Sequence, residues 1–263
     1  MTAVPWPLAA FLPSLPLDFA GAVRQAAGLG FTHVDVVACA DRPGSDLEAL
    51  ADAGVVVSCA ALGRGLPGGH TLDAGAPAAR RAALGALEQQ VADAARLGAT
   101  CAYLVPGQDA SAAGLAYFAE GCALLADYAG RRMVRLCVEH FPGRALPDAA
   151  GTLDWLARVG HANLGLLLDV GHCLLSGEDP AAVVRRAGDR LAYVQLDDND
   201  GAGDLHWPLL TGRLTGRHLA DLAAALGAAG YRGGMDLELN PGTADPVAAL
   251  REGKAIVERF FAG

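Results

Sequence analysis

The chain has 263 residues, enough for one large domain or two small ones. Its hydrophobic content of 52% against 19% charged residues excludes an intrinsically disordered protein. The formal net charge of −9 argues against nucleic acid as a partner. No apolar run reaches the ~18 residues of a membrane-spanning helix, so we expect no membrane partner.

Apolar runs and longer amphipathic stretches alternate along the chain. The runs predict buried strands at 8–12, 31–37, 55–60, 101–105, 133–138, 164–168, 191–196 and 235–239. The stretches between them predict helices at 18–29, 46–53, 77–97, 110–129, 148–159 and 219–229, with a short helix opened by Pro180 and a last one opened by Pro246.

This regular alternation predicts an α/β fold with a parallel sheet whose strands are buried on both faces. A doubly wound open sheet rarely carries eight regular units, whereas a closed (β/α)₈ TIM barrel typically takes ~250 residues. The sequence has no linker or low-complexity segment that would separate a second domain. We therefore expect residues 1–263 to form a single TIM barrel domain.

Cysteine usage and the N-terminal residues both favour the cytoplasm. The six cysteines form no C-x-x-C pair, which is typical of reduced, buried thiols. Residues 1–17 are apolar, but they lack a basic leader and contain four prolines that would break a signal helix. We expect a soluble cytoplasmic protein.

Three predicted strands end in a carboxylate that packing alone does not explain. Glu139 follows the run 134–138, Asp169 follows 164–168, and Glu238 lies between two leucines. The C-terminal strand ends of a barrel form its active-site face, so these side chains should converge there. Three unpaired buried carboxylates would repel one another strongly, and a bound cation relieves that repulsion.

Four motifs occur in order at the strand ends: V-E-H at 138–140, L-D-V-G-H at 168–172, D-N-D-G with D-L-H within 198–206, and D-L-E at 236–238. This ordered set resembles the xylose isomerase-like TIM barrel family. That family includes sugar isomerases and ketose 3-epimerases, hydroxypyruvate isomerase, inosose dehydratase and endonuclease IV. The resemblance covers nearly the whole chain in strand order.

The resemblance implies a divalent metal held by four residues: Glu139, Asp169, Gln195 and Glu238. Gln195 departs from the pattern, because the family usually has histidine there. An all-oxygen site favours Mn²⁺ or Mg²⁺ and leaves Zn²⁺ and Co²⁺ as alternatives. It also leaves open that the metal is weakly held, or that Gln195 contacts only the substrate.

The resemblance also implies a sugar or small hydroxy-carbonyl isomerase or epimerase that transfers a proton through a metal-stabilised enediolate. Glu139 and Glu238 would move the proton from opposite faces, and His172 would bind a substrate oxygen. Asp204 and His206 are the further substrate-binding candidates, with holding of their own loop as the alternative. The implied partner is a small polyhydroxy carbonyl substrate, and homodimers or homotetramers are common in the family.

Two other functions stay open at this stage. The first is a lyase or dehydratase that acts on a keto-sugar or inosose on the same scaffold, since it begins with the same proton abstraction. The second is a non-catalytic member of the family, in which the altered metal site performs no reaction and the protein acts as a partner subunit. A DNA-repair enzyme of the endonuclease IV type is disfavoured, because no histidine follows the runs at 55–60 and 101–105.

Overall fold

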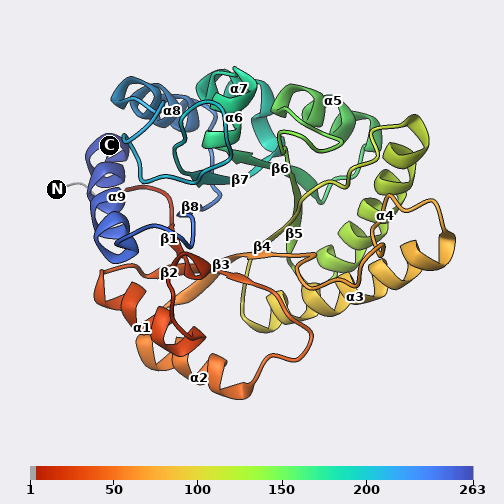
Figure 1. Cartoon of the computed structure of the whole chain (residues 1–263), viewed down its shortest axis with the longest axis horizontal. Coiled ribbons are helices and arrows are strands. Elements are labelled where there is room, and N and C mark those ends of the chain that lie inside the picture. Colours follow the sequence, from red (N-terminus) through yellow and green to blue (C-terminus); the bar gives the residue numbers. More distant parts are fainter. Residues whose placement is uncertain (1–3, 263) are drawn as a thin grey trace.

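The computed structural model describes residues 4–262, which form a closed barrel of eight parallel strands. Neighbouring strands pair in chain order, and pairing of the last strand with the first closes the barrel (Figure 1). The strands are β1 Leu8–Phe11, β2 His33–Val37, β3 Val56–Ala61, β4 Cys101–Leu104, β5 Arg135–Glu139, β6 Leu164–Asp169, β7 Leu191–Leu196 and β8 Met235–Leu237. Each overlaps a strand predicted from the sequence, so the predicted TIM barrel is confirmed.

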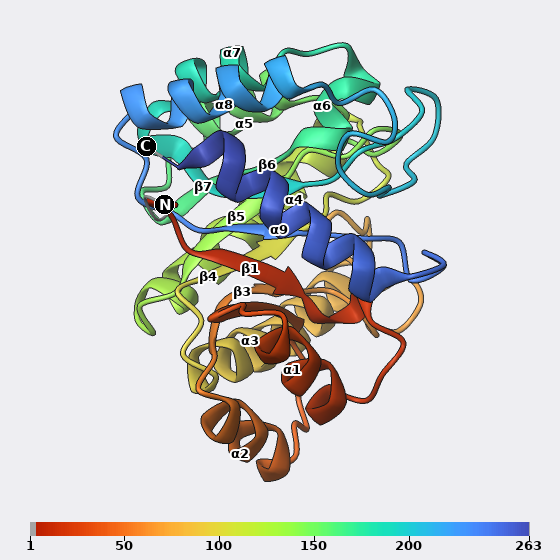
Figure 2. The same cartoon turned by 90° about the vertical axis from the view of Figure 1, so that its left-hand side faces the viewer.

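Helices surround the barrel as an outer layer (Figure 1), and Figure 2 shows α8 and α9 packed along its outside. They are α1 Phe19–Gly28, α2 Gly44–Ala53, α3 Pro77–Arg96, α4 Ala112–Gly130, α5 Ala149–Val159, α6 Val170–Ser176, α7 Pro180–Ala187, α8 Gly216–Ala228 and α9 Pro246–Phe261. The sequence did not predict α6. None of the helices described has both the length and the apolar content needed to cross a membrane.

Local sequence signals explain where the helices begin. Asp18 and Asp148 cap α1 and α5 by accepting hydrogen bonds from backbone amides three residues later. Pro180 and Pro246 occupy the first turn of α7 and α9, where the missing amide hydrogen costs nothing. These signals fix the strand-to-helix connections on the C-terminal side of the barrel.

Side-chain alternation along each strand divides the core into two regions. Leu164, Leu166 and Leu168 pack outward in the larger cluster between the sheet and the helices. Leu167 packs inward with a smaller cluster that fills the barrel. By the same alternation, Asp169 faces the barrel interior at the C-terminal end of β6. The barrel is thus a packed core with polar residues at one end.

Candidate active site

Four buried polar side chains occupy the C-terminal end of the barrel interior. Glu139 ends β5, Asp169 ends β6, Gln195 lies near the end of β7, and Glu238 directly follows β8. Their exposed fractions are 4%, 0%, 1% and 7%. All four sit at inward-facing positions of neighbouring strands, which is why residues far apart in the sequence come together here.

The four side chains form two contacting groups. Ligand atoms of Glu139, Asp169 and His172 lie within 4.8 Å of one another. Gln195 donates a hydrogen bond from Nε2 to Glu238 Oε2 at 2.6 Å. Within the described part of the chain, Glu238 does not belong to a group of three acidic, histidine or cysteine ligands at that spacing.

The residues that follow Asp169 form the short helix α6 rather than a loop. Asp169 caps this helix, because its Oδ1 accepts a hydrogen bond from the backbone amide of His172 at 2.7 Å. The amide of Gly171 donates to Asp197 Oδ1 at 2.8 Å, and a side chain at Gly171 would overlap that carboxylate. This close packing places the His172 ring beside the strand-end carboxylates.

His172 is surrounded by acceptors. Its Nδ1 lies 3.2 Å from Glu139 Oε1 and 3.6 Å from Asp169 Oδ2, and its Nε2 lies 3.2 Å from Asp204 Oδ1. Burial alone would lower the pKa of His172, but these three carboxylates outweigh it and raise the pKa to about 12. The ring therefore carries a positive charge at neutral pH in the metal-free protein.

Asp204 connects His172 to His206 in the loop after β7. Its Oδ1 lies 3.1 Å from His206 Nε2, and His206 Nδ1 lies 2.9 Å from Asp197 Oδ2. Burial raises the pKa of Asp204, but the two imidazoles outweigh it and hold that pKa below its usual range. The loop thus adds an alternating row of acids and imidazoles to the site.

Neighbouring polar residues support this arrangement. Asp198 holds the loop by accepting hydrogen bonds from the amides of Gly212 at 2.6 Å and Leu214 at 2.8 Å. His140, buried beneath the site, accepts a hydrogen bond at Nε2 from the Asp169 amide at 3.3 Å. Burial and the charge of His172 lower the pKa of His140 to about 3, so His140 is neutral.

The carboxyl groups of the site are costly to ionise together. Burial raises the pKa of Glu238 to about 8; the charge of His206 opposes the shift and the neighbouring carboxylates add to it. Burial and the charge of Asp169 raise the pKa of Asp197 to about 7. Burial also raises the pKa of Glu139, although the contact with His172 lowers that pKa in part. Such a cluster is characteristic of functional sites.

The donor set fits a hard divalent cation. Asp169 Oδ2 and Gln195 Oε1 are buried oxygens without a hydrogen-bond partner among the residues described. A buried polar atom left in this way costs free energy that a metal bond can offset. Together with Glu139 and Glu238, these atoms make a set of carboxylate and amide oxygens, which suits Mn²⁺ or Mg²⁺.

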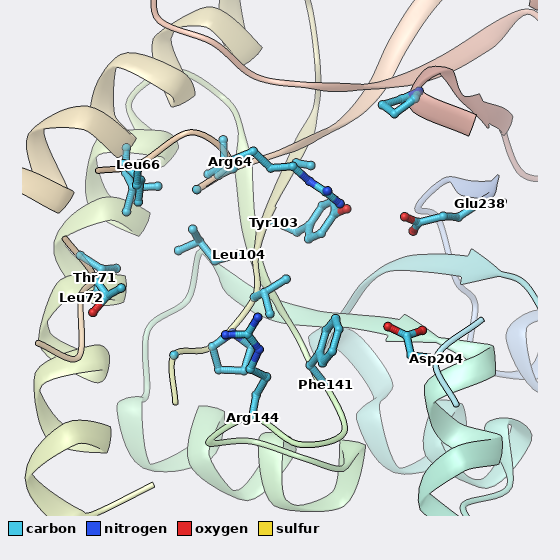
Figure 3. Close-up of a pocket in the computed structure, with 18 of the residues that line it drawn as sticks. Arg64, Leu66, Thr71, Leu72, Tyr103, Leu104, Phe141, Arg144, Asp204 and Glu238 are labelled. Carbon is cyan, nitrogen blue, oxygen red and sulfur yellow. The ribbon is translucent and has the colours of Figure 1, made fainter. Parts of the chain in front are cut away.

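A cavity of about 530 Å³ reaches Glu238, and Asp204 and His206 line it as well. In Figure 3, Glu238 and Asp204 lie on one side of it, Phe141 lies between Asp204 and Arg144, and the Arg64 side chain reaches over Tyr103. The arginines, Arg64 and Arg144, come from the loops after β3 and β5, and Tyr103 comes from β4. Glu238 and Asp204 were predicted as site residues from the sequence, whereas Tyr103, Phe141, Arg64 and Arg144 were not.

Tyr103 could have been found from the alternation of β4. Cys101 and Tyr103 share the inward face of that strand, so the tyrosine lies one layer nearer the site. Burial, with Glu238 and Glu139 nearby, raises the pKa of Tyr103 well above its ordinary value, so its hydroxyl stays protonated and can donate a hydrogen bond. The loop arginines carry no comparable sequence signal.

Parts of this chain are similar in sequence to known proteins. It is 30% identical over 122 residues to 3-dehydroshikimate dehydratase from Pseudomonas putida, which covers 44% of this chain and 19% of that protein. It is 34% identical over 109 residues to a putative hydroxypyruvate isomerase from Streptomyces coelicolor, covering 41% and 36% of the two chains. The chain thus spans about a fifth of the dehydratase and just over a third of the isomerase.

Solved structures share the whole fold. A crystal structure of D-psicose 3-epimerase in the presence of D-fructose superposes with a TM-score of 0.81 at 19% identity, covering 98% of this chain and all of that one. At this identity the likeness establishes the fold alone. Residues 23–259 also match the family model described as "Xylose isomerase-like TIM barrel". The chain therefore belongs to the xylose isomerase-like TIM barrel family.

Proposed function

We propose that the protein is a divalent-metal-dependent isomerase or epimerase that acts on a small polyhydroxy carbonyl compound. One observation carries the proposal: Glu139, Asp169, Gln195 and Glu238 are buried at one end of the barrel, Glu238 lines an open cavity there, and two oxygens of the set lack a partner among the described residues. Glu139, Asp169, Gln195 and Glu238 would hold Mn²⁺ or Mg²⁺. When bound, the cation supplies stabilisation of negative charge that develops on a carbonyl oxygen.

The two glutamates suit proton transfer next to a carbonyl group. β6 and β7 separate Glu139 on β5 from Glu238 after β8, so the two carboxylates approach a bound substrate from different sides of the barrel. A general base works best when its pKa lies near the operating pH, and in the metal-free protein burial raises the pKa of Glu238 to about 8. One glutamate would remove the α-proton and the other would return a proton to the opposite face or to the neighbouring carbon.

The charged imidazoles suit the substrate oxygens. Burial lowers the pKa of both histidines, but nearby carboxylates outweigh it and raise both values. For His172 these are Asp169 and Asp204, and for His206 they are Asp197 and Asp204. His206 lines the cavity, where its ring can donate a hydrogen bond to a hydroxyl or carbonyl oxygen of the substrate, and His172 is buried against Asp204. Asp204, which contacts both rings, would hold them in position.

Exchange of substrate hydrogen with solvent tests this function directly. The Mn²⁺-loaded protein is incubated in D₂O with a panel of ketoses, inososes and hydroxypyruvate, and deuterium at the α-carbon is measured by NMR. We expect exchange with at least one compound, and a loss of at least about 100-fold in Glu139→Gln and Glu238→Gln. Either variant exchanging at the wild-type rate, with an unchanged circular dichroism spectrum, would refute the proposal.

Elimination of water is a second candidate, favoured by the 30% identity to a 3-dehydroshikimate dehydratase over 122 residues. Elimination begins with the same α-proton removal and then needs an acid for the departing hydroxyl group. His206, which lines the cavity and whose pKa is raised by Asp197 and Asp204 against the effect of burial, would supply that proton. An ultraviolet assay separates the candidates, because a dehydratase produces a conjugated carbonyl compound and an epimerase does not.

A further inference from the structure

The cavity above the site contains charges of both signs. Its acidic side is formed by Glu238 and Asp204, and two arginines line it elsewhere, Arg64 and Arg144. Figure 3 shows the Arg64 side chain extending over Tyr103, and the Arg144 side chain standing beside Phe141. Asp73 also lines the cavity, so the two arginines are cationic side chains in a lining that holds three carboxylates.

Neither guanidinium group is neutralised by the protein. In residues 4–262, no carboxylate lies within 4.0 Å of Arg64 or Arg144. Arginines elsewhere do have such partners: Arg42 contacts Asp93 at 2.9 Å, and Arg186 contacts Asp154 at 2.7 Å. Neither of the two cavity arginines forms an ion pair in this part of the chain, so their remaining N–H donors are available for a bound molecule.

Arg64 belongs to a loop segment that a buried glutamine holds in place. Gln90 Oε1 accepts a hydrogen bond from the Gly63 amide at 2.7 Å, and Gln90 Nε2 donates to the Arg64 carbonyl at 3.0 Å. Gln90 is 7% exposed and lies on α3, which packs against the outside of the barrel. The backbone of Arg64 is therefore anchored although its side chain is exposed.

Arg144 is positioned by its neighbours as well. Its guanidinium lies 5.6 Å from the centre of the Phe141 ring. Gln108, with its side-chain oxygen turned toward Arg144, accepts a hydrogen bond from Nη1 at 2.8 Å. Ala145, which follows Arg144 in the chain, donates a hydrogen bond from its backbone amide to the Gly107 carbonyl at 3.0 Å. Phe141 also contacts the His172 ring, at 4.5 Å between centres, and so links this arginine to the catalytic end.

We infer that Arg64 and Arg144 form an anion subsite, and that the substrate carries a carboxylate or phosphate group at the end remote from its reacting carbonyl. This inference rests on the proposed function, because it concerns the substrate of the same cavity. Guanidinium groups bind both anions through paired N–H donors. A neutral sugar would leave both guanidinium groups without an anionic partner. An anionic hydroxy-carbonyl compound would pair its anionic group with the arginines while its carbonyl group lies at the acidic side of the cavity.

Matched pairs of anionic and neutral probes test the subsite. The carboxylate arm compares shikimate with methyl shikimate, and the phosphate arm compares fructose 6-phosphate with fructose. Dissociation constants are measured by isothermal titration calorimetry at constant ionic strength, with metal-free and with Mn²⁺-loaded protein. We expect the anionic member of at least one pair to bind at least about tenfold tighter than its neutral partner.

Arginine variants assign that preference to the subsite. Arg64→Met and Arg144→Met should each weaken binding of the anion by about 10- to 100-fold and leave the neutral partner within about twofold. Arg64→Lys and Arg144→Lys should retain part of the preference, because they keep the charge and lose the paired donors. Arg81→Met is the control, since Arg81 is an exposed arginine of α3 outside this cavity.

The outcomes separate this inference from the proposed function. Equal affinity for anionic and neutral probes in both arms overturns the subsite, as does a preference that survives both methionine substitutions. Deuterium exchange tests the chemistry separately: Glu238→Gln should lose exchange while keeping the arginine-dependent preference. Exchange by the wild type without any anion preference would leave the proposed function standing and the subsite wrong.

Discussion

Gln195 donates a hydrogen bond to Glu238, with 2.6 Å between Nε2 and Oε2. This bond fixes the orientation of the amide and leaves Gln195 Oε1 buried without a partner among the described residues. A single amide thereby orients one carboxylate and offers one oxygen to the site. The residue that departs from the family pattern fits an all-oxygen metal site.

Substitution of Gln195 should change metal affinity in a graded way. Gln195→Leu removes both functions of the amide, and we expect Mn²⁺ affinity to fall by about 10- to 100-fold. Gln195→His introduces a nitrogen ligand, which should shift the preference from Mn²⁺ toward Zn²⁺. Competition titrations measure both effects; unchanged affinities in the leucine variant would show that Gln195 does not take part in metal binding.

The metal-free protein should lose stability as pH rises through neutrality. Glu238 and Asp197 have folded-state pKa values of about 8 and about 7, against ordinary values of 4.5 and 3.8. Folding therefore favours their protonated forms, and their contribution is lost as pH rises from about 4 toward 8. His172, with a pKa of about 12 against 6.5, contributes stability below pH 6.5 and loses it progressively above.

Thermal melts between about pH 6 and about pH 9 measure this effect. The melting temperature of the metal-free protein should fall across that range. Saturating Mn²⁺ should offset the fall, because a cation stabilises the ionised carboxylates and binding adds stability by mass action. A metal-free melting temperature that rises over this range would contradict the assignment of a carboxylate cluster.

Removal of the Asp204 charge should affect both imidazoles. Asp204→Asn keeps the size of the side chain but removes the carboxylate that raises the pKa of His172 and His206. NMR titration of the histidine rings should show both pKa values falling. Asp200→Asn is the matched control, because Asp200 is exposed in the same loop and accepts hydrogen bonds from Ala202 and Gly203. An equal response to both substitutions would contradict the role of Asp204.

Gly171 should tolerate no side chain. In Gly171→Ala the new methyl group would overlap the Asp197 carboxylate, so α6 and His172 would have to shift. We expect a loss of about 1–3 kcal/mol in the free energy of unfolding, measured by urea denaturation. Gly85→Ala, at an open position of α3, should instead raise stability by up to about 1 kcal/mol. Equal effects of the two substitutions would rule out the close contact.

The fold was predictable because its signals are local and repeated. Short apolar runs predict the strands, and Asp169 and Glu139 directly follow two of these runs, which places them at the C-terminal ends of β6 and β5. The parallel pairing of all strands then requires both carboxylates to lie at one end of the barrel. Helix α6 escaped prediction although Asp169 is a favourable N-cap residue, because only seven residues follow before it ends.

Other parts of the site depend on contacts between distant loops. Asp197, which the sequence did not predict as a site residue, contacts His206 and accepts a hydrogen bond from the Gly171 amide. Arg64 and Arg144 reach the cavity from loops whose paths depend on Gln90 and Gln108. No periodic pattern marks such residues, because their positions are set by tertiary packing rather than by local sequence.

Metal binding by the purified protein tests the central claim most directly. The metal-free protein is titrated with Mn²⁺, and bound metal per chain is measured by calorimetry and by mass spectrometry, with Asp169→Asn as the comparison. We predict one Mn²⁺ per wild-type chain and an affinity at least about tenfold lower in the variant. A wild-type chain that binds no Mn²⁺, Mg²⁺, Co²⁺ or Zn²⁺ would contradict the account.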